Sequence, residues 1–97
     1  MEAQNIGAHE LALAIINDGG GYERRCAIAR RATAKENGRG GNAQTDALAW
    51  LSVALDGARK YERQFGSYGA SCFTPSDILG AAIELCEYYA QHIAEGV

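Results

Sequence analysis

The side chains that could perform acid–base or nucleophilic chemistry are few, and their spacing forms no catalytic pair. The chain has two histidines, His9 and His92. A general base needs a nucleophile or an orienting acid within hydrogen-bond reach. Glu10 adjoins His9, but neighbouring residues of a helix point about 100° apart. Cys86 and His92 face different directions for the same reason, so we expect a protein that is not an enzyme.

The three cysteines, Cys26, Cys72 and Cys86, are separated by gaps of 46 and 14 residues. This odd number and spacing form neither a disulfide framework nor a paired C-x-x-C zinc site, and the H-x-x-x-H motif is absent. We therefore predict free thiols, as in a reducing compartment, with no metal and no cofactor. Cys86 is expected to be buried and unreactive, and Cys72 to react first because it lies in a loop.

Two glycine clusters invite a comparison with phosphate-binding loops. Such loops follow a strand and open a helix, and the mononucleotide type carries Lys-Ser/Thr. Gly19–Gly21 follow a helical segment instead, and no such lysine is present. We interpret them as the end of a helix, where glycine readily takes the left-handed cap conformation, followed by a linker. The single Arg39-Gly40-Gly41 sequence carries little weight as an RNA-binding motif.

Charge is unevenly distributed along the chain, whose net charge is −3. Residues 19–41 contain six cations and two carboxylates, whereas the chain from Gln64 onward contains four carboxylates and no lysine or arginine. Arg24, Arg31 and Lys35 share one predicted helical face, with Arg25 and Arg30 beside it. Opposite charges on separate elements indicate either mutual contact or two recognition faces.

Composition favours one helical domain. The chain has 97 residues, which corresponds to a single domain over residues 1–97. Eighteen alanines against two valines and one proline favour helices over strands. No apolar run approaches the roughly 20 residues that span a bilayer. The N-terminus lacks the basic-then-apolar order of a signal peptide, so we expect a cytoplasmic protein without a membrane partner.

The periodicity of apolar residues predicts an all-α fold, a compact four-helix bundle. The third helix has the widest apolar arc, which includes Ala47, Leu48, Leu51 and Leu55, so we expect it to be the central helix. The last two helices should form an antiparallel hairpin. The predicted helices cover residues 8–18, 22–37, 43–65 and 75–95.

The last helix has the clearest start signal. Thr74 can cap it, Pro75 suits its first position, and Asp77 favours the positive end of its dipole. Its predicted core face consists of Ile78, Leu79, Ala82, Leu85, Cys86, Tyr89 and Ile93.

The opposite face of this helix is a candidate recognition surface. Only one of the adjacent residues Tyr88 and Tyr89 can point into the core, and the helical wheel selects Tyr89. Tyr88 is then exposed among polar residues, which is typical of a recognition patch. Gly80 lies on the same side, where a partner's close approach would explain it. The predicted acidic face consists of Gly80, Glu84, Glu87, Tyr88, Gln91 and Glu95.

Two functions follow as hypotheses. The first is a non-enzymatic interaction module, a monomer or homodimer, whose acidic face contacts a basic protein surface and competes with its normal ligand. Small acidic helical proteins of this kind are common among phage-encoded inhibitors of host defence, including anti-CRISPR proteins, which is an association of type. The alternative is a nucleic-acid-associated protein that contacts phosphates through the basic helix 22–37, which the acidic pI of about 5.3 disfavours.

Overall fold

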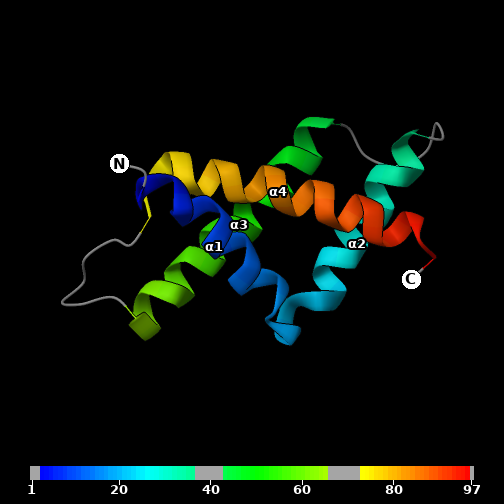
Figure 1. Cartoon of the computed structure of the whole chain (residues 1–97). Coiled ribbons are helices and arrows are strands. Elements are labelled where there is room, and N and C mark those ends of the chain that lie inside the picture. The colour runs from blue at the N-terminus through cyan, green and yellow to red at the C-terminus, as the bar shows by residue number, and fades with distance from the viewer. Residues whose placement is uncertain (1–2, 37–42, 66–72, 97) are drawn as a thin grey trace.

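The computed structural model describes residues 3–36, 43–65 and 73–96, and these form four packed helices without strands (Figure 1). The predicted all-α four-helix bundle is confirmed. The first helix begins five residues and ends two residues earlier than predicted, and the boundaries of the other three helices lie within one residue of the prediction. The elements are α1 (Ala3–Ile16), the 3₁₀ turn η1 (Gly19–Gly21), α2 (Tyr22–Glu36), α3 (Ala43–Phe65) and α4 (Pro75–Ala94).

Helix α4 is the central element, and the prediction that α3 would be central is wrong. Each of the other three helices makes its most extensive contacts with α4, which crosses the width of the molecule in Figure 1. The α4 residues Ala81, Ala82, Leu85 and Tyr89 are buried. Two adjacent alanines let neighbouring backbones approach closely, so α4 is covered on several sides.

Helices α3 and α4 pack in an antiparallel orientation, as predicted. Trp50 stacks on Tyr89 with ring centroids 5.7 Å apart, and Tyr61 meets Phe73 edge to face at 5.1 Å. Trp50, in the first half of α3, contacts Tyr89 in the second half of α4, whereas Tyr61, near the end of α3, contacts Phe73 just before α4 begins. The two helices therefore run in opposite directions. Aromatic pairs of this geometry add to the stability gained from burial alone.

The predicted start of α4 is confirmed. The backbone N–H of Asp77 donates to the Thr74 hydroxyl oxygen at 3.1 Å, and the backbone N–H of Thr74 donates to the Asp77 carboxylate at 2.9 Å. This reciprocal arrangement is a capping box with Pro75 in the first turn. It satisfies two donors that the helix itself leaves free.

Gly80 is explained by packing between helices, which corrects the expectation that a partner's close approach accounts for it. A Cβ placed on Gly80 would lie 2.9 Å from the Cβ of Ala8 on α1. Gly57 plays the same role on α3, where a Cβ would lie 2.4 Å from Cγ1 of Ile15. Glycine at both positions lets α1 pack closely against its two neighbours.

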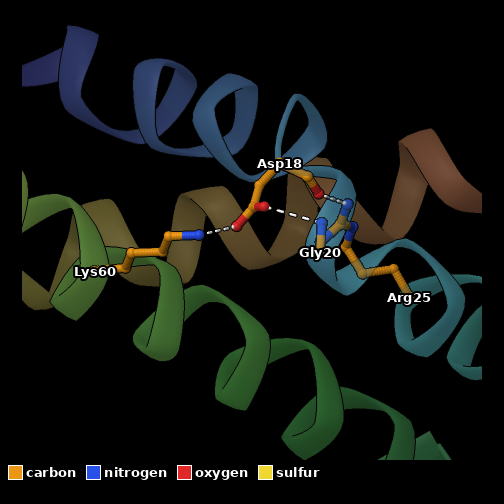
Figure 2. A network of polar contacts seen from close by, with 4 residues as sticks. All are labelled: Asp18, Gly20, Arg25 and Lys60. Atoms are coloured by element: carbon orange, nitrogen blue, oxygen red, sulfur yellow. Dashed lines mark hydrogen bonds and ion pairs between the residues drawn. The ribbon is translucent and has the colours of Figure 1, made fainter.

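The turn between α1 and α2 is held by side chains rather than by left-handed glycines (Figure 2). Among the described glycines only Gly96 has a positive φ, so the predicted left-handed cap at Gly19–Gly21 is wrong. Asp18 instead accepts from the backbone N–H of Gly20 at 3.0 Å and from Lys60 Nζ at 2.6 Å. Arg25 donates to the Asp18 carbonyl oxygen at 2.6 Å. These contacts tie both helices to α3.

The rotation of α3 and α4 about their axes differs from the prediction. On α3, Trp50, Val53, Ala54 and Ala58 are buried, whereas Ala47 and Leu48 are exposed. On α4, the predicted core residues Leu79 and Cys86 are exposed. Both helices carry apolar residues around more than one face, so several rotations bury similar area, and packing against α1 and α2 selects one.

Candidate protein-interaction surface

An apolar groove lies between α3 and α4. Its volume is about 410 Å³, and we call it the α3–α4 groove. Two charged residues, Asp46 and Glu87, accompany an otherwise apolar lining. The residues that line it are Ala32, Asp46, Ala47, Trp50, Leu51, Leu79, Ala82, Ile83, Cys86 and Glu87.

The groove has unusually exposed apolar walls. Leu79 and Ile83 on α4 line the groove and are 52% and 53% exposed. Single exposed leucines are common on protein surfaces, but neighbouring ones around a hollow mark interaction sites. Trp50 closes the floor of the groove and is buried.

The sequence prediction placed part of this groove in the core. Leu79 and Cys86 belong to the predicted core face of α4, and Ile83 belongs to neither predicted face. Cys86 is exposed, so the prediction that it is buried is wrong, and Cys72 lies outside the described residues. The sequence signal that could have revealed the groove is the width of the apolar arc on α4. A helix that buries a single apolar stripe needs fewer apolar positions than α4 carries.

Asp46 places a poorly compensated carboxylate in the groove. Its side chain is largely buried, and Arg31 Nε lies 3.6 Å from its Oδ1 as an ion pair. This oxygen accepts no hydrogen bond from any described residue. Buried carboxylate oxygens normally have at least one such partner. The groove is therefore lined by a carboxylate that has an unfilled acceptor position, although solvent does not reach this Oδ1 atom.

The charge environment of Cys86 is negative. Partial burial raises the pKa of its thiol, and the carboxylates of Glu87 and Asp46 raise it further. A negative charge disfavours the thiolate, which moves the pKa upward. Burial and the two carboxylates therefore both disfavour the thiolate, which is the nucleophilic form.

The predicted acidic face of α4 is divided among three locations. Gly80 contacts α1, as described above. Glu84 pairs with His9 of α1, whose Nδ1 lies 2.6 Å from Glu84 Oε2. Glu87 lines the α3–α4 groove. Only Tyr88, Gln91 and Glu95 remain together, and with His92 they line a shallow hollow of about 250 Å³ near the end of α4.

An aromatic cluster supports this end of α4. Tyr88 is exposed and Tyr89 is buried, as predicted. Tyr88 stacks on His92 with centroids 6.0 Å apart, and His92 Nε2 lies 2.7 Å from the hydroxyl of Tyr22 on α2. The ring of Tyr88 is therefore held in place by its neighbours. A rigid exposed tyrosine loses little conformational entropy when a partner covers it.

The predicted basic face of α2 is turned toward α3. Arg24 donates to Asp56 and to Ser52, both at 3.2 Å, and Arg31 pairs with Asp46. The side chain of Lys35 lies outside the described part of the chain. These pairs compensate part of the positive charge with carboxylates of α3, not with those of α4.

Arg25 does not flank an exposed basic face, which corrects the prediction for this residue. It is 3% exposed and donates from Nε to the Tyr89 hydroxyl at 2.8 Å. Its guanidinium carbon lies 5.5 Å from the centroid of the Tyr89 ring. One cation of the basic helix is thus part of the core.

Within the described ranges, His, Cys, Asp and Glu side chains form no group of three that could bind a metal ion. In the same part of the chain, every helix is too short or too polar to cross a bilayer. Comparison with protein-family models, with curated proteins and with solved structures gave no match to this chain.

Proposed function

We propose that the protein is a non-enzymatic module that binds another protein through the α3–α4 groove. The observation that carries the proposal is the exposure of Leu79 and Ile83 beside a hollow of about 410 Å³. Covering these side chains would remove apolar surface from water, at about 25 cal/mol per Å². The apolar groove replaces the predicted acidic face as the main contact surface.

A protein fits this groove better than a small molecule does. Sites for small ligands usually enclose most of the ligand surface. Here the α4 wall ends in side chains that are more than half exposed, namely Leu79 and Ile83. Side chains that project outward are suited to insertion between side chains of a partner, as at the apolar centre of a protein interface.

The acidic residues have a supporting role in this proposal. Glu87 lines the groove, and Glu95 lies near Tyr88 beyond it. Carboxylates around an apolar centre accelerate association with a cationic surface and help to fix its orientation. A module of this kind would block its partner by occupying the partner's surface, as the hypothesis of a phage-type inhibitor requires.

Paired substitutions of exposed apolar residues test the proposal. Ile83→Gln removes an apolar wall of the groove but keeps a good helix former, and Leu13→Gln makes the same type of change on α1, where Leu13 is 43% exposed. Both variants and the wild type are immobilised and exposed to lysate of the source cells. Proteins retained by the wild type are then identified and remeasured in purified form.

The proposal requires that a purified partner bind the wild type and Leu13→Gln equally and bind Ile83→Gln at least about tenfold more weakly. If Ile83→Gln retains full affinity for every purified partner, the groove is not the binding surface. Circular dichroism and the urea midpoint confirm that each variant is folded.

A further inference from the structure

We infer that the α3–α4 groove accepts an amphipathic helix of the partner, and that a lysine or arginine of this helix reaches Asp46. This inference rests on the proposed function and specifies the chemistry of the partner. It combines the shape of the groove with the unused acceptor capacity of one buried carboxylate.

The shape of the groove favours a helix. Its walls are ridges of two helices, with Ala47 and Leu51 at i, i+4 on α3 and Leu79 and Ile83 at i, i+4 on α4. Ridges at this spacing accept the side chains of a third helix. From Leu79 to Glu87 the groove follows α4 for about 12 Å, or two helical turns. An occupant would present apolar residues at i, i+3 or i+4 and i+7, as in known helix-in-groove complexes.

A partner strand has no place to pair on this surface. Strand addition needs a free sheet edge, and the described ranges contain no strand. Backbone groups of α3 and α4 are used within the helices, so the groove offers side chains only. This leaves apolar contacts and the carboxylates as its means of recognition.

The carboxylates select the charge of the occupant. Asp46 lines the groove with a side chain that is 12% exposed, and its inaccessible Oδ1 accepts no hydrogen bond from the described residues but pairs with the Arg31 guanidinium at 3.6 Å. Glu87 lies on the same groove and is exposed. A charged donor from the occupant would pair with the exposed part of the Asp46 carboxylate and would be drawn to the groove by both carboxylates.

The raised pKa of Cys86 is consistent with this charge distribution. Asp46 and Glu87 both act on the thiol from positions that line the groove. Their fields therefore overlap within the hollow that the occupant would enter. An anionic occupant would meet the same repulsion that disfavours the Cys86 thiolate.

Two synthetic helical peptides test the inference directly. Each has about 18 residues, because isolated helices shorter than about 12–15 residues are marginally stable in water. Both carry leucines at i, i+4 and i+7, and the flanking positions are lysines in one peptide and glutamates in the other. Trp50 is the only tryptophan of the chain and lines the groove, so its fluorescence reports binding.

Matched substitutions separate the carboxylate from the apolar walls. Asp46→Asn neutralises the groove, and Asp56→Asn neutralises another α3 carboxylate that pairs with α2, through Arg24, outside the groove. We expect the lysine peptide to bind the wild type and Asp56→Asn equally. We expect its affinity for Asp46→Asn to be about tenfold lower, as for loss of a charge-assisted hydrogen bond. Ile83→Gln should weaken it as well.

Three results would overturn the inference. One is equal affinity for the lysine and glutamate peptides, and another is that neither peptide alters Trp50 fluorescence. The third is a wild-type dimer in sedimentation that Ile83→Gln converts to a monomer, because the occupant is then a second copy of the chain. The first two results leave the proposed function standing if purified partners still depend on Ile83.

Discussion

Arg25 illustrates how a single residue can change role between sequence and structure. It belongs to a basic segment, yet its guanidinium is buried against Tyr89 and tied to the carbonyl of Asp18. Burial of a cation is costly unless its donors are satisfied. These two acceptors, together with the face of the Tyr89 ring, provide the compensation.

Replacement of Arg25 should therefore destabilise the fold. Arg25→Met preserves much of the volume but leaves the Tyr89 hydroxyl without its donor, and we expect a loss of about 2–3 kcal/mol in the free energy of unfolding. Urea denaturation measures this loss. Arg30→Met, on an exposed residue of the same helix, should change it by less than about 0.5 kcal/mol. Equal effects at the two positions would contradict the buried role of Arg25.

The thiols provide a second test at the residue scale. In a Cys72→Ser background, Cys86 should be modified in the native state, and Cys26 only on unfolding, because Cys86 is exposed and Cys26 is buried. Because the thiolate is the reactive form, the raised pKa of Cys86 means that a higher pH is needed for rapid modification. Glu87→Gln should shift the pH–rate profile of Cys86 modification toward lower pH, because it removes a carboxylate that raises the pKa of the thiol. Modification of Cys26 first would show that α2 and α4 are packed differently.

At the scale of elements, close helix approach depends on glycine. Gly80→Ala gains helix propensity of about 1 kcal/mol but places a methyl group 2.9 Å from Ala8. We expect a net loss of about 1 kcal/mol, since overpacking costs about 1–3 kcal/mol. Ala8→Gly should relieve the clash, so the double variant should be more stable than additivity predicts. Thermal unfolding of the four proteins measures this coupling, and strict additivity would refute the contact.

The turn between α1 and α2 makes stability depend on pH. The hydrogen bond from Lys60, followed by that from the Gly20 backbone, lowers the pKa of Asp18 below its ordinary value of 3.8. Because the folded-state pKa is the lower one, the stabilisation is complete above pH 3.8 and is lost as pH falls through the folded value.

Asp18→Asn keeps an acceptor for Gly20 but removes the charge. Its free energy of unfolding should therefore fall less steeply than that of the wild type below pH 3.8. The ion pair with Lys60 is near the surface, so the difference should not exceed about 1 kcal/mol. Urea unfolding at a series of pH values measures it. Identical pH dependence in the two proteins would show that Lys60 does not stabilise the turn.

At the scale of the whole molecule, the distribution of charge argues against tight binding to nucleic acid. The net charge is −3, and Arg24 and Arg31 face carboxylates of α3. We expect fluorescence anisotropy with a labelled DNA duplex to detect only weak binding at 50 mM salt, roughly millimolar in Kd. Micromolar affinity that falls steeply with salt would instead support the alternative hypothesis of phosphate contacts by α2.

Local signals allowed much of the helical architecture to be predicted. The cap at Thr74, the boundaries of the last three helices, and the choice of Tyr89 over Tyr88 for the core all follow from interactions within a few residues. Such interactions are written directly into the sequence, because a cap and a helical period need no distant partner. The α3–α4 groove was not predicted, although the apolar residues that line it can be read in the sequence.

By itself, the sequence determined approximately where the helices lie and that α3 and α4 each carry an apolar arc. Only the tertiary structure decided which part of each arc is covered. Contacts between distant residues, such as Gly80 with Ala8 and Gly57 with Ile15, fix the rotation of each helix. That rotation left Leu79 and Ile83 at the surface, because several rotations bury similar apolar area and only close packing between helices distinguishes them.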